Sequence, residues 1–247
     1  MKNRYRKTIA FVSFLFILSF GIFSFAFTSS ANNLEGNMAS PSFSIYFLAT
    51  AKSQLESEAS VLAKDEMASG NGGYVWQEEN YFYVISSAYE NKNDATLVSN
   101  NLKNEGIKND VFEISFPSLS FPTTFEKSEE KSTFFTSINL FYSLYKQLFD
   151  ISICLDTNLY SETQALLEIN TLQAKADETM KNFSLLFTEQ TSQIFCSLEE
   201  AIVDTNETIG MLAEKQTLSP KQNLLSLTRY SYTKILAIYH IFLEKIQ

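Results

Sequence analysis

The sequence contains few residues of the kinds that build metal or disulfide sites. Its 247 residues include two cysteines, Cys154 and Cys196, and a single histidine, His240. Two distant cysteines are too few for a disulfide framework or a CxxC zinc site, so they are expected either as free thiols or as one disulfide between neighbouring helices. One histidine cannot build a zinc site unaided, and a Cys–His nucleophile would lack the glycine-rich context that usually shapes such a pocket. No cofactor is expected.

Positive charge is also scarce. The chain has 19 Lys and Arg residues against 28 Asp and Glu residues, which gives a formal net charge of −9. Binding to nucleic acid depends on clustered cations that displace counterions from the phosphate backbone, and no basic stripe follows the N-terminal residues. The composition therefore argues against a nucleic-acid partner.

A long uncharged run lies close to the N-terminus. Residues 2–7 carry four positive charges and residues 8–28 carry none. About 20 apolar residues cross the hydrocarbon core of a bilayer as a helix, and the positive flank stays cytoplasmic. Residues 1–28 are therefore predicted to be a cytoplasmic tip and a transmembrane anchor, with the body of the protein outside the cytoplasm. A cleaved signal peptide is the alternative, because small residues follow at 28–31.

A first folded unit is expected over residues 43–116, after a polar tether at 29–42. Strands are predicted at 43–50, 74–76, 81–89 and 111–115, and helices at 53–69 and 92–105. Ser53 with Glu56 predicts a capping box for the first helix, and Asn91 predicts the cap of the second. In the resulting β-α-β-β-α-β order, right-handed crossovers place both helices on one face of the sheet and leave the other face open.

The second half of this unit, residues 83–107, resembles a SPOR domain. That family carries a Y-V-x-V-G-x-F strand, a polar turn, an alanine that opens the helix and a Leu-Lys-x-x-Gly exit. The matching positions are Tyr83, Val84, Ser86, Ser87, Tyr89, Ala95, Leu102, Lys103 and Gly106. The first half is similar only at Phe47, Leu48 and Ala59, and both strand glycines of the family are replaced.

The resemblance to SPOR domains implies that the open sheet face binds peptidoglycan glycan strands stripped of their peptides. Aromatic rings suit the flat C–H faces of sugars, and a few fixed polar groups suit their hydroxyls. By strand alternation, Ala49 and Ala51 share the face of Phe47. The candidate glycan-binding residues are Phe47, Tyr74, Trp76, Tyr83, Ile85 and Ser87.

Other interpretations of these aromatic residues stay open. Tyr83 and Trp76 fit a place in a hydrophobic core as well as they fit a binding face. Ala49 and Ile85 stand where SPOR domains often carry Gln or Arg, and this favours a scaffold that has lost its glycan contacts. A place in the core is expected for Phe43, Ile45 and Phe82.

A helical region is expected over residues 125–247, after a linker with two prolines at 117–124. Gly210 is its only glycine, and apolar residues recur at alternating spacings of three and four. The predicted seams are Phe135, Ile138, Tyr142, Tyr145 and Phe149, and later Leu225, Thr228, Tyr232, Ile235, Tyr239, Phe242 and Ile246. This pattern predicts a coiled-coil-like bundle of three helices of about 30, 55 and 28 residues. The middle helix is expected to bend or split near Thr188 or Gly210.

Capping signals mark the starts of the later helices. Ser161 with Gln164 predicts one capping box, and Ser219 with Gln222 predicts another. The Glu and Lys residues of this region are scattered over the presumed outer faces, so no acid/base pair emerges. The helical region is expected to act as a spacer, a dimeriser or a partner-binding bundle.

The sequence as a whole predicts an α+β protein with a membrane anchor helix, a βαββαβ ferredoxin-like SPOR-type domain and an all-α bundle. The expected function is that of a single-pass cytoplasmic-membrane protein whose extracytoplasmic body binds peptidoglycan glycan strands, at division or sporulation septa. A non-enzymatic interaction scaffold of the cell envelope that has lost glycan binding is the alternative. An envelope protein or a second copy is the expected partner of the helical region. A cell-wall enzyme is disfavoured because no nucleophile–base or metal constellation is found.

Overall fold

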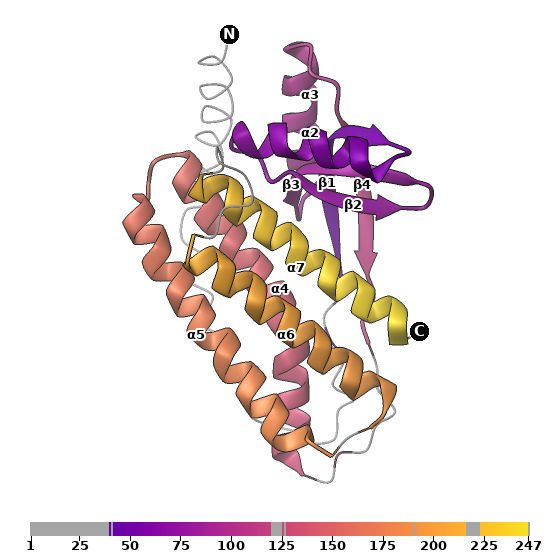
Figure 1. The fold of residues 1–247 in the computed structure, drawn as a ribbon, viewed down its shortest axis with the longest axis vertical. Helices are drawn as coiled ribbons and strands as arrows, with labels where there is room; N and C mark the ends of the chain where they lie inside the picture. Colours follow the sequence, from indigo (N-terminus) through magenta and orange to yellow (C-terminus); the bar gives the residue numbers. More distant parts are fainter. Residues whose placement is uncertain are drawn as a thin grey trace.

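The computed structural model shows an α+β protein with three layers (Figure 1). The residues described are 40, 42–119, 125, 127–189, 191–215 and 223–246. Within them, helices α2 (Glu56–Ala68) and α3 (Lys92–Asn104) cover one face of a four-stranded antiparallel sheet, and helix α7 (Leu224–Ile246) runs along the other face. Helix α4 lies beside α7 and also contacts the sheet, where Tyr142 packs against Phe43, and α5 and α6 complete the bundle.

The sheet and its two covering helices follow the predicted β-α-β-β-α-β order. The elements are β1 (Phe43–Ser53), α2 (Glu56–Ala68), β2 (Tyr74–Glu78), β3 (Tyr81–Tyr89), α3 (Lys92–Asn104) and β4 (Asp110–Phe116). The strands lie in the order β2-β3-β1-β4, and all neighbours are antiparallel. Helix α2 packs closely on the sheet because it buries the small side chains of Ala59 and Ala63 against Val84.

The start of α2 differs from the predicted capping box. The N-cap is Leu55, which makes no side-chain cap bond. Ser53 is still part of β1, where it pairs with Phe82. Its hydroxyl oxygen accepts from the backbone N–H of Leu55 at 3.0 Å and donates to the carboxylate of Glu58 at 2.7 Å. The prediction that Ser53 and Glu56 form a capping box is therefore wrong, because the strand runs further than its composition indicated.

Helix α3 begins and ends as predicted. The side chain of Asn91 accepts from the backbone N–H of Asn93 at 2.8 Å, which satisfies one of the free donors of the first turn. After the helix, Gly106 takes a φ of 82°, and Ile107 donates back to the carbonyl of Leu102.

Two irregularities in the pairing of β1 with β3 change which residues share a face. The register shifts between Leu48 and Ala49 and again between Ala49 and Ala51. A bulge leaves a residue unpaired and so interrupts the alternation of side chains. Ala51 consequently pairs with Val84 and packs toward α2, whereas Phe47 and Ala49 belong to the core on the opposite face. The predicted placement of Ala51 beside Phe47 is wrong for this reason.

The helical region contains four described helices where three were predicted. They are α4 (Ser128–Asp156), α5 (Glu162–Phe187), α6 (Gln193–Ala213) and α7 (Leu224–Ile246). The predicted long middle helix is split at Thr188, one of the two expected positions, whereas Gly210 lies inside α6. The capping box of Ser161 with Gln164 is confirmed at the start of α5. The capping box predicted at Ser219 lies outside the described residues.

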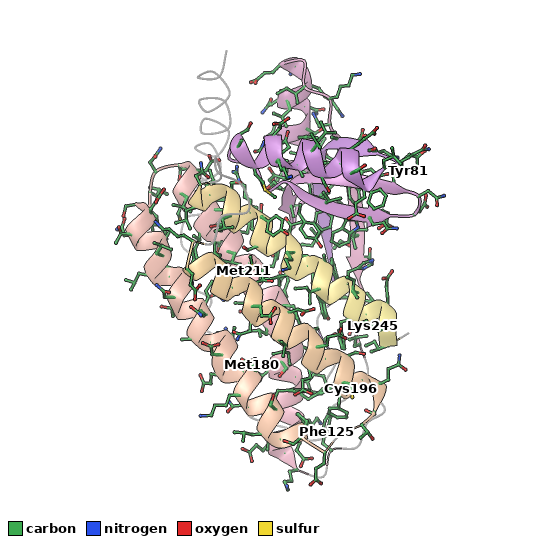
Figure 2. All side chains as sticks on the ribbon, in the orientation of Figure 1. Tyr81, Phe125, Met180, Cys196, Met211 and Lys245 are labelled. Carbon is green, nitrogen blue, oxygen red and sulfur yellow. The ribbon has the colours of Figure 1, made fainter. Side chains whose placement is uncertain are left out.

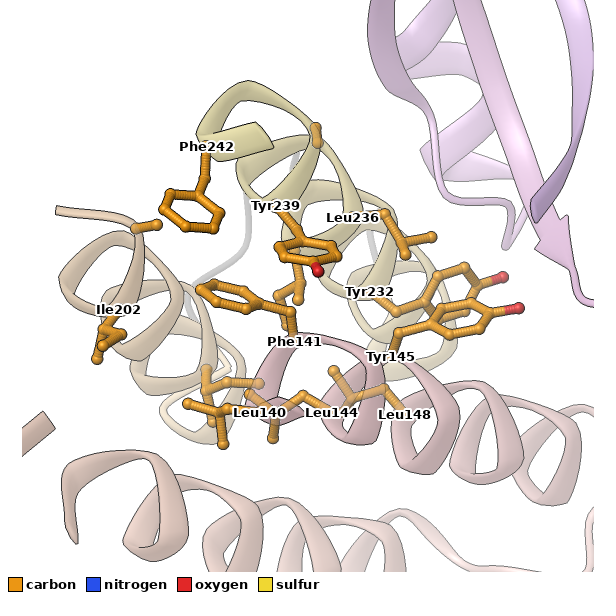
Figure 3. Packing of buried hydrophobic residues seen from close by; sticks show 14 of the residues in the cluster. Leu140, Phe141, Leu144, Tyr145, Leu148, Ile202, Tyr232, Leu236, Tyr239 and Phe242 are labelled. Atoms are coloured by element: carbon orange, nitrogen blue, oxygen red, sulfur yellow. The ribbon is translucent and has the colours of Figure 1, made fainter. Parts of the chain in front are cut away.

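One hydrophobic core joins the sheet to the bundle. It includes Phe47 and Ile85 from the sheet, Tyr145 from α4 and Leu236 from α7. Figure 3 shows how residues of α4 and α7, with Phe141 against Tyr239 and Tyr145 against Tyr232, fill the space between these helices. Fourteen of the 23 residues of α7 are buried, because the helix contacts the sheet on one side and the other helices on the opposite side.

The prediction of a membrane-anchored protein requires correction. No helix in the part of the chain that the structure describes is long and apolar enough to cross a membrane. The segment 8–28, for which an anchor helix was predicted, lies outside the described residues. The single-pass topology and the extracytoplasmic placement of the body are therefore not supported. The fold class that the structure supports is α+β, with a four-stranded antiparallel sheet and six described helices.

Two glycines with positive φ give a matched test of this packing. Gly73 has a φ of 63°, and a Cβ atom there would collide with the backbone carbonyl oxygen of Ala63. Gly106 has a φ of 82°, and a Cβ atom there would meet only open space. We expect Gly106→Ala to lower the free energy of unfolding by about 1 kcal/mol, the cost of a left-handed conformation. We expect Gly73→Ala to cost roughly 1–3 kcal/mol more through overpacking, as measured by urea unfolding. Equal losses would contradict the close approach of α2 to Gly73.

Candidate functional site

Four of the six predicted glycan-binding residues lie in the core beneath α7. Phe47 and Ile85 are 0% exposed and Trp76 is 3% exposed. Ser87 is also buried, and its hydroxyl oxygen lies 2.8 Å from the hydroxyl oxygen of Tyr232 on α7. The rings of Phe47 and Trp76 are 4.7 Å apart between centroids, so they contact each other within the core.

The other two predicted residues, Tyr74 and Tyr83, are half-buried. The ring of Tyr74 lies 5.4 Å from that of Tyr230, and burial, with a smaller contribution from Tyr230, raises the pKa of Tyr74 to about 12. The ring of Tyr83 lies 4.9 Å from that of Phe112, and the ammonium of Lys52 lies 4.8 Å from its centroid. The structure therefore brings all six predicted residues onto one sheet, mainly as packing partners of one another and of α7.

A buried ion pair, which the sequence analysis did not identify, fixes α7 in this position. Arg229 of α7 donates to the carboxylate of Asp156 at 2.9 Å and to the backbone carbonyl of Gly70 at 3.0 Å. The two side chains are 8% and 13% exposed. Burial alone would lower the pKa of Arg229, but Asp156 and nearby tyrosines raise it above its ordinary value. The pair thereby joins α7 to the end of α4 and to the loop before β2.

Further hydrogen bonds join the sheet unit to the bundle around this ion pair. Ser226 donates to the backbone carbonyl of Asn71 at 2.7 Å, and Tyr145 donates to the carbonyl of Ala88 at 3.5 Å. Gly72 permits the close approach, because a Cβ atom there would lie 3.2 Å from the backbone of Arg229. The sequence signal for this ion pair was a lone arginine among the apolar residues of a predicted helix. An arginine in such a place is rarely buried without a partner.

A groove of about 400 Å³ remains accessible between β2 and α7. Its lining residues are Tyr74, Val75, Trp76, Gln77, Glu78 and Glu79 from β2 and its turn, and Ala237, His240, Ile241 and Glu244 from α7. The indole N–H of Trp76 donates to the carboxylate of Glu78 at 3.1 Å. The imidazole of His240 lies 5.4 Å from the Trp76 ring between centroids, and its Nε2 atom lies 3.5 Å from the carboxylate of Glu244. Two predicted site residues, Tyr74 and Trp76, thus border the groove.

Cys154 has the properties of a structural thiol. Its thiol is free, so the predicted alternative of a disulfide between Cys154 and Cys196 is wrong. Burial, and secondarily the charge of Asp150, raises the pKa of its thiol above the ordinary value. Among the residues that the structure describes, no three His, Cys, Asp or Glu side chains are grouped so that they could hold a metal ion.

Comparisons with models of protein families, with curated proteins and with solved structures find no match to this chain. The resemblance to SPOR domains therefore depends on the residues of 83–107 and on the order of strands and helices around them.

A double-mutant cycle tests the buried ion pair. Arg229→Met leaves the carboxylate of Asp156 without its partner, so we expect the free energy of unfolding to fall by roughly 3–5 kcal/mol. Adding Asp156→Asn removes the orphaned charge, so we expect the double variant to recover at least about 1 kcal/mol of that loss. Urea unfolding of the two single variants and the double variant measures the coupling. Strictly additive losses would show that the two residues do not act as a pair.

Proposed function

We propose that this protein is a non-enzymatic protein-interaction scaffold, in which a SPOR-like sheet holds a helical bundle in the place where a glycan strand was expected. The observation that carries the proposal is the burial of Phe47, Trp76 and Ile85 between the sheet and α7. A sugar ring would have to displace α7 to stack on Phe47 or Ile85, neither of which lines the groove between β2 and α7.

The energies favour the covered arrangement over an exchange of α7 for a sugar. Fully burying a large apolar side chain contributes roughly 1.5–3 kcal/mol, and three such residues are buried here. Stacking between two aromatic side chains adds about 0.5–1.5 kcal/mol per pair, and a bound sugar would have to replace this contribution as well. Displacing α7 would also break the ion pair of Arg229 with Asp156 and the contact of Ser87 with Tyr232. A glycan that replaced α7 would have to offset all of these losses.

Glycan binding is the second candidate, and one observation favours it. Tyr81 and Tyr83 are only half-buried, and Tyr81 lies at the end of the sheet away from the bundle (Figure 2). The ammonium of Lys52 lies 3.7 Å from the centroid of the Tyr81 ring. These residues offer aromatic and polar groups that α7 leaves accessible. This patch is smaller than the face that the sequence predicted.

A sedimentation assay with peptidoglycan sacculi distinguishes the two candidates. We expect the full chain to stay in the supernatant both with untreated sacculi and with sacculi digested by an amidase to expose bare glycan. Immunoblotting of pellet and supernatant measures the distribution. Sedimentation with the digested sacculi that is lost in a folded Tyr83→Ala variant would support glycan binding and overturn the scaffold proposal.

The stability of a Trp76 variant tests the same proposal from inside the protein. If Trp76 holds the sheet against α7, Trp76→Ala should lower the free energy of unfolding by roughly 3–5 kcal/mol, the usual cost of truncating a buried aromatic residue. Tyr81→Ala, a half-buried position on the neighbouring strand, should cost much less. Urea unfolding measures both variants. A Trp76→Ala variant with unchanged stability would show that this side chain is available for a ligand.

A further inference from the structure

We infer that the groove beside β2 binds an extended, lysine- or arginine-bearing segment of a partner protein, which adds a strand to the sheet. This inference rests on the proposed scaffold function and names the chemical class of its partner. Three observations support it: the place of β2 at the edge of the sheet among the described strands, the wall formed by α7 and the charge of the groove.

The groove follows the outer edge of β2, the terminal strand of the described sheet. Strand β2 has β3 as its only neighbour among the described strands, and six consecutive residues, 74–79, line the groove. Consecutive residues of a strand point to opposite faces, so a groove lined by all of them runs along the backbone edge and not over one face. A strand edge of this kind presents N–H and C=O groups to a peptide.

The turn after β2 shows which backbone groups face the groove. Glu78 pairs with Tyr81, so the hairpin loop has two residues, and Glu79 at its first position has a φ of 52°. Residues that flank a two-residue loop form a hydrogen-bonded pair, and such pairs alternate along the ladder. Val75 and Gln77 therefore occupy the positions whose N–H and C=O groups point away from β3. A bound strand would pair with these two residues.

Helix α7 forms the opposite wall of the groove. Ala237, His240, Ile241 and Glu244 follow the i, i+3, i+4, i+7 spacing of one helix face. Ile241 is 48% exposed, so it offers apolar contact to alternate side chains of a peptide. The five residues of β2 extend over about 17 Å, which matches a peptide segment of about five residues.

The charge of the groove selects a basic occupant. Glu78, Glu79 and Glu244 line it, and among the described lining residues none is lysine or arginine. A second copy of this chain is a poor occupant, because its net charge is −9 and its own β2 edge carries Glu78 and Glu79 toward a groove that already holds three glutamates. Anionic polymers are disfavoured for the same reason. A lysine- or arginine-bearing strand supplies both the main-chain groups and the complementary charge.

Fluorescence anisotropy with defined peptides tests the inference on the full chain. The probe is a fluorescein-labelled seven-residue peptide of alternating lysine and valine. The matched peptides are one with glutamate in place of lysine and one with proline in place of valine, which cannot donate to a strand edge. We expect saturable binding of the lysine–valine peptide and at least about tenfold weaker binding of the other two, a difference of about 1.4 kcal/mol.

Two protein variants locate the binding site. Gln77→Pro removes an outward N–H at an edge position that tolerates proline, so we expect at least about tenfold weaker binding with unchanged thermal unfolding. Glu78→Gln with Glu244→Gln should weaken binding about fivefold or more and reduce its dependence on salt. The control is Asp177→Asn with Glu178→Gln, an equal loss of charge on an exposed face of α5, which should leave binding unchanged.

The outcomes separate this inference from the proposed function. Equal binding of all three peptides, absence of binding, or equal effects of the groove and control variants would overturn the groove as a peptide site. Strand pairing between two copies, seen as a dimer that Gln77→Pro dissociates, would also overturn it. None of these results alters the distribution of the protein in the sacculus assay, on which the scaffold function is judged.

Discussion

The two-sided burial of α7 is the constraint on which the rest of the structure depends. One side of this helix packs into the bundle and the other side meets the sheet, and Tyr232 touches both, with its ring against Tyr145 of α4 and its hydroxyl against Ser87 of β3. A helix in this position must satisfy every polar group that it carries inward. Arg229 meets the requirement in part: its two terminal nitrogens donate to the carbonyl of Gly70 and to Asp156, whereas its Nε atom is buried without a hydrogen-bond partner among the described residues. With α7 fixed, the sheet face and the bundle interior become parts of a single core.

The resulting architecture gives the four-stranded sheet an unexpected role. A four-stranded sheet with helices on one face has to cover its other face or make it polar. In this protein the face is aromatic, and a segment of the same chain covers it. Its aromatic residues are therefore better understood as the contact surface of an internal partner. The polar groups that remain accessible lie at the edge of the sheet, where β2 and α7 border an acidic groove.

Most of the helices and strands could be predicted from local signals in the sequence. Features that depend on residues distant in the sequence could not. The β-α-β-β-α-β order, the cap at Asn91 and the capping box at Ser161 depend on neighbouring residues, and the structure agrees with them. The bulges in β1 depend on pairing with β3, so alternation alone misplaced Ala51. The second buried face of α7 was missed because it uses small and polar residues such as Ser226 and Ala237, which carry no hydrophobic period. For the site, the aromatic residues of the sheet could be identified from the sequence, but no local pattern indicated that α7 packs over them.

The distance along the chain between the sheet and its cover affects how the protein folds. Ser87 and Tyr232 are 145 residues apart, and Arg229 and the carbonyl of Gly70 are 159 residues apart. Contacts of such long sequence separation close late and slow the search for the native state. During synthesis the aromatic face would emerge well before α7, so a nascent chain would expose a hydrophobic surface of the kind that chaperones bind. The segment that covers the sheet therefore also determines when the sheet can become native.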